Sequence, residues 1–169
     1  SDRVRIALKA LEEAENEEKK GNYVTKTENG YRRIVAAPLP EKIIEIDAIK
    51  ALSDAGQIVI AAGGGGIPVL EQDEELTGAS AVIEKDLISG KLACLLDADE
   101  LLILTSVENA SVNYHSETEK QLGRVSVSEL KAYMEEGHFE DNTMLPKIQA
   151  SIEFVEGKPG RTAVITSIG

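Results

Sequence analysis

Three runs of apolar residues, rich in β-branched side chains, stand in the second part of the chain. They are Ile58 to Ala62, Leu101 to Thr105 and Thr162 to Ser167, and stretches of helical character separate them. Strands that are apolar at nearly every position belong to sheets covered on both faces, as parallel sheets are. The pattern therefore predicts three strands of a mainly parallel sheet.

Helical signals fill the stretches between these strands. Apolar residues recur at helical spacing from 41 to 55, and Ser126 stands three residues before Glu129, as in a capping box. Glycines that suit the end of a helix follow three of the segments. The predicted helices, in chain order, are 41–55, 86–96, 126–136 and 143–156. Helices alternating with apolar strands predict a layered α/β domain.

The beginning of the chain has a different pattern. Residues 4–20 are rich in Ala, Leu, Glu and Lys, which predicts a charged helix that ends near Gly21. A polar stretch then leads to Asn29-Gly30, a dipeptide typical of β-hairpin turns. Because two prolines follow, we place a domain boundary near Pro38. We expect residues 1–37 to form a small protruding helix-hairpin subdomain and residues 38–169 to form the main lobe.

Composition narrows the range of partners. The chain has 169 residues, of which 42% are hydrophobic, enough for one main domain with an appendage. Its formal net charge of −12 repels nucleic acid and anionic membrane surfaces, which bind clustered basic faces. We therefore expect neither as a partner, and no apolar run has membrane-spanning length. The single cysteine, Cys94, excludes internal disulfides and cysteine-based metal clusters, which points to a reducing cytoplasm but is compatible with other compartments.

Four consecutive glycines, Gly63, Gly64, Gly65 and Gly66, follow the first predicted strand. A fold keeps such a run where the backbone turns sharply or approaches a ligand closely, as in a loop that binds phosphate. No Lys-Ser or Lys-Thr pair follows the run, and Pro68 stands where a dinucleotide fingerprint has its third glycine. The loop therefore matches neither common phosphate-binding pattern, although it is expected at the carboxyl end of a strand, where α/β sheets bind ligands.

Two lysines are predicted at the beginning of helices. Lys85 stands between Glu84 and Asp86 at one of them, and Lys147 lies in the first turn of another, directly after Pro146. A lysine at this position opposes the helix dipole unless an anion binds there as well. Two such lysines, on helices that follow converging strands, suggest two cations directed at one polyanion. For Lys85 the alternative is a helix capped by Asp86, with the ammonium group in solvent.

The two histidines are weaker candidates. His138 follows a glycine that ends a predicted helix, a position more typical of a partner for the helix dipole than of a catalytic base. His115 lies in a polar loop. Neither has a serine or cysteine partner at a recognisable spacing, so the sequence predicts no nucleophilic catalysis.

Five blocks of sequence carry a family resemblance. They are Gly-Tyr-Arg-Arg-Ile-Val at 30–35, Gly-Gly-Gly-Gly-Ile-Pro-Val at 63–69, Ala-Val-Ile-Glu-Lys-Asp at 81–86, Gly-His-Phe through Met-Leu-Pro-Lys at 137–147, and Ala-Val-Ile-Thr-Ser at 163–167. Together they closely resemble carbamate kinases, which belong to the amino-acid kinase superfamily. One glycine run alone is a weak signal, whereas five blocks in this order are specific.

The resemblance is to the C-terminal, ATP-binding lobe of these enzymes. It implies a three-layer α/β/α sandwich with a mainly parallel central sheet. It further implies reversible phosphoryl transfer between ATP and carbamate, giving ADP and carbamoyl phosphate, with Mg²⁺ bridging the phosphates. A cytoplasmic homodimer that acts in arginine metabolism is the corresponding expectation for the whole enzyme.

The resemblance also implies roles for single residues. Lys85 and Lys147 would hold the phosphates and stabilise the transferring group, and Asp86 would orient the two lysines. The four glycines would supply backbone amides near the acceptor and the γ-phosphate. The residues expected against the nucleotide are Thr105, Ser106, Val107, Met144 and Pro146.

Before Gly63 the chain has no glycine-rich strand-turn of the kind that contributes to the phosphate and carbamate sites in the family. We therefore expect an incomplete acceptor site, either in part of a larger enzyme or in a lobe that binds nucleotide and turns over little. Two other functions stay open. One is a non-catalytic nucleotide-binding or assembly module of the same fold, and the other is a kinase for a different acidic acceptor, such as glutamate or an N-acylated amino acid.

Overall fold

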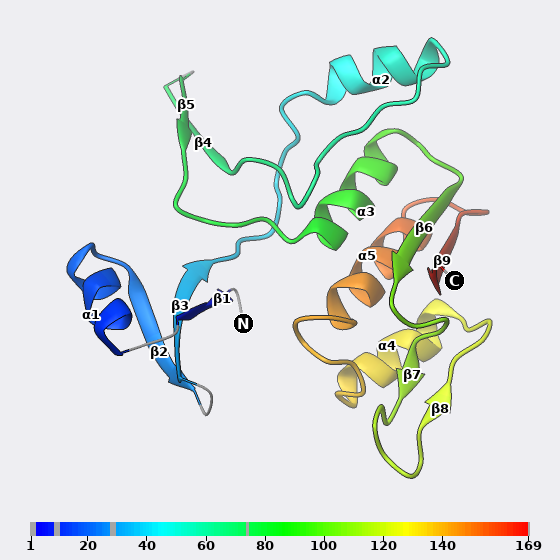
Figure 1. Cartoon of the computed structure of the whole chain (residues 1–169). Helices are drawn as coiled ribbons and strands as arrows, with labels where there is room; N and C mark the ends of the chain where they lie inside the picture. Colours follow the sequence, from blue (N-terminus) through cyan, green and yellow to red (C-terminus); the bar gives the residue numbers. More distant parts are fainter. Residues whose placement is uncertain (1–2, 9–10, 28–29, 74, 169) are drawn as a thin grey trace. The chain divides into compact units, whose positions relative to one another are not determined.

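The computed structural model describes residues 3–8, 11–27, 30–73 and 75–168. The chain divides into two compact units (Figure 1). The first comprises Ser1–Leu39 and Gly66–Ile83, and the second comprises Pro40–Gly65 and Glu84–Gly169. The domain boundary near Pro38 was predicted from the two prolines that follow the hairpin. This division into units does not test it, so it stays a prediction.

The first unit contains a three-stranded antiparallel sheet and a separate hairpin. Its elements are β1 (Arg3–Leu8), α1 (Leu11–Lys19), β2 (Tyr23–Thr27), β3 (Gly30–Ala36), β4 (Val69–Gln72) and β5 (Glu75–Gly78). The strand order is β1-β3-β2, and β4 pairs with β5 alone. The predicted hairpin is confirmed, because Thr27 pairs with Gly30. The predicted turn at Asn29-Gly30 falls partly outside the described residues, which exclude residues 28–29.

The helix predicted for residues 4–20 is wrong in its first part. Residues 3–8 form β1, which pairs along its full length with β3, and the helix begins only at Leu11. The sequence Arg-Val-Arg-Ile-Ala-Leu alternates between polar or small residues and larger apolar ones, which is the period of a strand. Overall richness in helix-forming residues concealed this short alternation, and pairing with β3 decided the conformation.

The second unit carries the α/β part of the chain. Its elements are α2 (Ile46–Asp54), α3 (Lys85–Leu95), β6 (Glu100–Thr105), β7 (Ser111–Val112), β8 (Lys120–Gln121), α4 (Val127–Glu135), α5 (Leu145–Glu156) and β9 (Thr162–Ser167). Strands β6 and β9 pair in parallel, from Glu100 opposite Thr162 to Thr105 opposite Ser167. Two of the three predicted strands and their parallel pairing are therefore confirmed.

The third predicted strand does not form. Residues 58–62 have no regular structure, and the side chains of Ile58 and Ile60 are 98% and 95% exposed. A strand is stabilised by hydrogen bonds to a neighbouring strand, and no described residue pairs with this segment. The apolar run indicates β propensity, but it does not indicate whether another strand lies beside it to pair with.

Local capping signals explain the helices of the second unit. In α4, Ser126 and Glu129 form both bonds of the predicted capping box. In α5, Pro146 occupies the first turn. Backbone N–H groups in a first turn have no acceptor within the helix, so the absence of an N–H on proline costs no hydrogen bond there. Gly56, after α2, has a φ of 77°, as expected for a glycine that ends a helix. All four predicted helices are present, although α2 begins five residues later than the start predicted at residue 41.

Helix α5 organises the core of this unit. Ile148 and Phe154 on α5 are almost completely buried. Ile148 belongs to a cluster with β7 and the loop before α5, and Phe154 packs with Leu101 and Ile103 of β6. Helix α3 lies alongside α5 (Figure 1). The packing places the N-termini of both helices and the carboxyl end of β6 within one unit. Among the described residues, no helix has the length and apolar character needed to cross a membrane.

Candidate functional site

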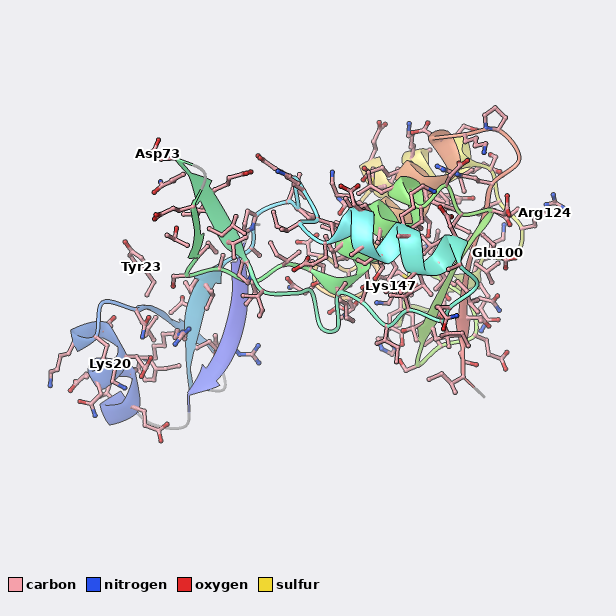
Figure 2. All side chains as sticks on the ribbon, turned by 90° about the horizontal axis from the view of Figure 1, so that it is seen from above. Lys20, Tyr23, Asp73, Glu100, Arg124 and Lys147 are labelled. Carbon is pink, nitrogen blue, oxygen red and sulfur yellow. The ribbon has the colours of Figure 1, made fainter. Side chains whose placement is uncertain are left out.

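The beginnings of α3 and α5 meet at one carboxylate. Lys147 Nζ donates a hydrogen bond to Asp86 Oδ2 at 2.6 Å, and the side chains of both residues are only 9% exposed. Lys85 Nζ lies 3.5 Å from the same oxygen and its side chain is 57% exposed. Figure 2 labels Lys147 among the side chains of the second unit. The two lysines predicted at helix N-termini therefore converge on Asp86.

The helix starts explain this arrangement. Glu84 caps α3, and its side chain accepts a hydrogen bond from the backbone N–H of Asp86, which places Lys85 and Asp86 in the first turn. The first turn of α5 likewise carries Lys147 after Pro146. An ammonium group has three N–H donors, and the bond to Asp86 uses one of those on Lys147. The remaining donors can reach an anionic ligand.

The charge on Lys85 is supported by its neighbours. Partial burial disfavours the ammonium form, but the carboxylates of Asp86 and Glu84 outweigh it and raise the pKa of Lys85 above its ordinary value. Lys85 is therefore a cation at neutral pH. The carboxylates of Asp86 and Glu84 lie beside the two ammonium groups, and the dipoles of both helices favour an anion at the same place.

A pocket of about 430 Å³ lies beside these groups, within the size range of small-molecule sites. The carboxyl end of β6, the following loop, and the loop that leads into α5 line it. This is the edge of a parallel strand pair at which α/β proteins bind ligands. Six residues singled out from the sequence line the pocket: Lys85, Thr105, Ser106, Val107, Met144 and Lys147.

Other predicted site residues lie outside the lining. Asp86 contacts the pocket only through its lysine partners, and Pro146 is buried in the first turn of α5. The four glycines are not lining residues, and they stand where the chain passes from the second unit to the first. Gly63, Gly65 and Gly66 all have positive φ angles, so the run does form a sharp turn. Its predicted place beside the phosphates stays a proposal.

Several lining residues did not stand out in the sequence. They are Leu104, Asn109, Ser111, Tyr114, His138, Phe139, Glu140, Asn142 and Thr143. His138 follows the end of α4, as the sequence predicts, and it also lines the pocket, where its Nε2 lies 2.9 Å from Oε2 of Glu136. The available signal was its place in the Gly-His-Phe block that leads into α5. The ring of Tyr114 lies 3.9 Å from that of its neighbour His115 between centroids, with the two planes tilted by 39°.

The donor set suits a phosphorylated ligand better than a protein-bound metal. Within the described part of the chain, no three His, Cys, Asp or Glu side chains gather in a group that could hold a metal ion. The pocket instead combines two lysines, several hydroxyl and amide groups, and apolar side chains such as Val107 and Met144. Cations at one place and apolar surface elsewhere are what the phosphates and base of a nucleotide require.

Comparison with known proteins identifies the family. The model of the amino acid kinase family matches residues 10–167. The carbamate kinase-like protein YqeA of Escherichia coli (strain K12) is 50% identical over 157 residues, which are 92% of this chain and 50% of that protein. Carbamate kinase of Clostridium perfringens is 47% identical over 159 residues, and carbamate kinase 2 of Enterococcus faecalis is 45% identical over 159 residues. The chain spans about half the length of these curated relatives.

Solved structures agree with this result. Carbamate kinase from Giardia lamblia bound to AMP-PNP matches 94% of this chain and 51% of its own, with a TM-score of 0.84 and 37% sequence identity. A structure from Aeropyrum pernix K1, described only as project APE1968, matches 99% of this chain and 54% of its own. Its TM-score is 0.86 and its sequence identity is 42%. The expected fold is thereby confirmed.

Proposed function

Because this chain belongs to the amino acid kinase family, we propose that it is the nucleotide-binding lobe of a carbamate kinase. The reaction is reversible phosphoryl transfer between ATP and carbamate, which gives ADP and carbamoyl phosphate. The curated carbamate kinases are about twice as long as this chain, and in the proposal the remaining part of the enzyme completes the carbamate site.

The observation that carries the proposal is the convergence of Lys85 and Lys147 on Asp86 beside a pocket of nucleotide size. Phosphoryl transfer requires little covalent chemistry from a protein, because catalysis comes mainly from positioning and from cations near the transferred group. Two lysines at adjacent helix N-termini meet that requirement. The geometry of the site supports phosphoryl transfer, and the likeness to carbamate kinases supports carbamate as the acceptor.

Each residue has a defined task in this proposal. Lys147 is held in place by its buried bond to Asp86 and offers its free N–H donors to the phosphate oxygens. The side chain of Lys85 is more exposed than that of Lys147. Its ammonium group can therefore move with the phosphoryl group as this passes between the nucleotide and the acceptor. Asp86 is a positioning residue, because it contacts both ammonium groups and not the substrate. Thr105, Ser106, Val107 and Met144 lie against the nucleotide.

Two further contacts belong to the proposal. The glycines Gly63 to Gly66 would offer backbone amides to the γ-phosphate and the acceptor, since no side chain blocks a close approach to that turn. Mg²⁺ would bind mainly through phosphate and water oxygens, because Mg²⁺ keeps several waters and needs only one or two carboxylates. That mode requires no cluster of protein carboxylates, and the described lining of the pocket contains none.

Three finer expectations extend the proposal to the whole protein. The full-length protein would be a cytoplasmic homodimer that takes part in arginine metabolism. The formal net charge of −12 disfavours binding to anionic membrane surfaces, which is compatible with the first point. Sedimentation of the full-length protein gives its oligomeric state directly.

The test is an assay of the full-length protein. Purified enzyme is given ADP, Mg²⁺ and carbamoyl phosphate, and ATP formation is followed by luminescence. Binding of ADP is measured separately by calorimetry. We expect both turnover and binding, and we expect Lys147→Ala to lower turnover by about two to three orders of magnitude, the effect of losing one preorganised charge.

Controls separate chemistry from folding. Lys85→Ala removes an exposed lysine, so we expect a similar loss of turnover without a change in melting temperature. Lys131→Ala is a matched control, because Lys131 also pairs with a carboxylate, Glu156, at 2.6 Å but lies outside the pocket lining. Near-normal rates in both pocket variants would refute the proposal. Binding of ADP without any turnover would instead support the non-catalytic module, and turnover only with another acyl phosphate would support a different acidic acceptor.

A further inference from the structure

Glu140 stands out among the residues that line the pocket. Of the described lining residues, it alone carries a carboxylate, in a pocket whose other charged side chains are Lys85 and Lys147. A carboxylate repels the phosphates that the lysines attract. Its presence therefore needs a reason other than phosphate binding.

The position of Glu140 is fixed by the loop that leads into α5. Its carboxylate accepts a hydrogen bond from Oγ1 of Thr143 at 2.7 Å. Its backbone carbonyl accepts hydrogen bonds from the N–H groups of Thr143 at 3.3 Å and Leu145 at 3.0 Å. The side chain and the backbone of Glu140 are thus both tied to the start of the helix.

The dipole of α5 does not account for this carboxylate. The helix begins at Leu145, and its N-cap residue, Met144, makes no side-chain cap bond. The effect of a helix dipole on a charge falls off within the first turn, and Glu140 stands five residues before that turn begins. Thr143 leaves most of the acceptor capacity of the carboxylate unused, since a carboxylate has about four lone-pair sites.

A carboxylate accepts hydrogen bonds and binds cations, and in the proposed function Mg²⁺ is held by phosphate and water oxygens. The ligand partner left for Glu140 is therefore a hydrogen-bond donor. A nucleotide offers two kinds of donor, the vicinal hydroxyls of its ribose and the amino group of its base. We propose that Glu140 accepts hydrogen bonds from the 2′- and 3′-hydroxyls of the nucleotide ribose and thereby selects ribonucleotides over deoxyribonucleotides. This inference rests on the proposed function, because it presupposes that a nucleoside phosphate occupies the pocket.

The order of groups along the loop favours the ribose. Glu140, the apolar Met144 and the cationic Lys147 follow one another within eight residues and all line the pocket. The ribose of a nucleotide is joined to both the base and the phosphates, so it lies near the groups that contact each of them. Glu140 is also an exposed residue, which suits a hydrated sugar edge better than a base amine enclosed among apolar side chains. Acidic side chains recognise ribose hydroxyls in the same way in dinucleotide-binding folds.

The experiment measures binding of ADP, 2′-deoxy-ADP and 3′-deoxy-ADP to the full-length protein by calorimetry. We expect the wild type to prefer ADP over 2′-deoxy-ADP by about ten- to hundredfold, the value of a hydrogen bond to a charged acceptor. Glu140→Ala should weaken ADP binding by a larger factor than it weakens binding of 2′-deoxy-ADP or 3′-deoxy-ADP, each of which keeps one hydroxyl for Glu140, so that the preference for ADP disappears. Glu140→Gln should retain part of the preference, because its amide oxygen still accepts. In the ATP-forming assay, Glu140→Ala should raise the KM for ADP with little change in kcat.

Asp141→Asn is the matched control, because Asp141 is an exposed neighbouring carboxylate outside the pocket lining and should leave every constant unchanged. The inference is overturned if Glu140→Ala weakens ADP and 2′-deoxy-ADP equally. It is also overturned if the variant keeps the wild-type preference, or if it loses discrimination against inosine diphosphate instead, which would place the base amine at Glu140. A wild type that binds no nucleoside diphosphate overturns the proposed function together with this inference. Binding of ADP without ribose discrimination overturns this inference alone.

Discussion

The ion pair between Lys147 and Asp86 is the residue-scale feature on which the site depends. Both side chains are buried, and the ammonium–carboxylate distance is 2.6 Å. Burying two charges costs desolvation energy that good geometry only offsets, so such a pair contributes little by itself to stability. Its value here is that it holds an ammonium group in one position at the start of α5.

Removal of one partner should therefore lower the free energy of unfolding by much more than the intact pair raises it. We expect Asp86→Asn to lower the free energy of unfolding by about 3 kcal/mol, because Lys147 is left as a buried charge without a counterion. Urea denaturation measures the change. Asp54→Asn is the matched control, since Asp54 forms an exposed pair with Lys50 on α2, and such pairs contribute below about 0.5 kcal/mol. Equal effects of the two substitutions would contradict the burial argument.

Asp97 gives a pH-dependent prediction at the same scale. Its carboxylate accepts hydrogen bonds from Lys158 at 2.7 Å and Arg161 at 3.0 Å, and these hold its pKa below its ordinary value. Because the pKa in the folded state is depressed, the stabilisation is present above the unfolded pKa of about 4 and is lost as the pH falls through the folded value.

We therefore expect Asp97→Asn to be less stable than the wild type at about pH 7 and the difference to shrink steadily below about pH 4. Urea unfolding at a series of pH values measures the difference. A gap between the two proteins that stays constant with pH would show that the carboxylate charge plays no part.

At the scale of elements, close contact between α3 and α5 positions the two lysines. Gly90 lies within α3, where a glycine is normally unfavourable by about 1 kcal/mol. A Cβ atom built on Gly90 would lie 3.0 Å from Cβ and 3.2 Å from Cα of Ala150 on α5. The glycine therefore permits the approach of the helices that carry Lys85 and Lys147.

Gly90→Ala should lower the free energy of unfolding by about 1 kcal/mol, because overpacking against α5 outweighs the gain in helix propensity. Thermal and urea unfolding measure this change. Combination with Ala150→Gly should recover part of the loss, whereas Gly123→Ala, where an added Cβ meets nothing within 4 Å, should stay within about 0.5 kcal/mol of the wild type. An increase in stability in Gly90→Ala would disprove the close-contact argument.

At the scale of the whole molecule, one face of the parallel pair β6–β9 carries exposed apolar side chains in the described part of the chain. Leu101 and Ile103 are buried against α5, while Leu102 and Val164, which are register partners, are 54% and 38% exposed. Parallel sheets are normally covered on both faces. The relatives are about twice as long as this chain, and in the proposed full-length enzyme we expect the additional part to cover this face.

It follows that the 169-residue chain, when produced by itself, should self-associate through this face. Analytical ultracentrifugation should show association that the double variant Leu102→Glu/Val164→Glu weakens by about tenfold or more, the effect of losing a buried aliphatic contact. Leu52→Glu, on α2, changes an equally exposed leucine away from the sheet and serves as the control. A chain that stays monomeric at all concentrations, or an equal effect of the control, would contradict this expectation.

Sequence reasoning succeeded where the controlling interactions are local. The capping box of Ser126 and Glu129, the proline in the first turn of α5 and the bounds of β9 all follow from residues a few positions apart. The same local signals placed Lys85 and Lys147 at the beginnings of helices. Five ordered blocks also identified the family, since their residues and order are properties of the sequence itself.

Tertiary structure decided the features that depend on distant residues. Residues 3–8 became a strand because β3 offered an edge, and residues 58–62 stayed irregular because no described strand pairs with them. The meeting of two lysines at one oxygen of Asp86, 61 residues from Lys147, depends on the packing of α3 against α5. Glu140, His138 and Tyr114 joined the pocket for the same reason. Helix caps act within one turn of chain, whereas strand pairing and pocket lining depend on which remote segments the core brings together.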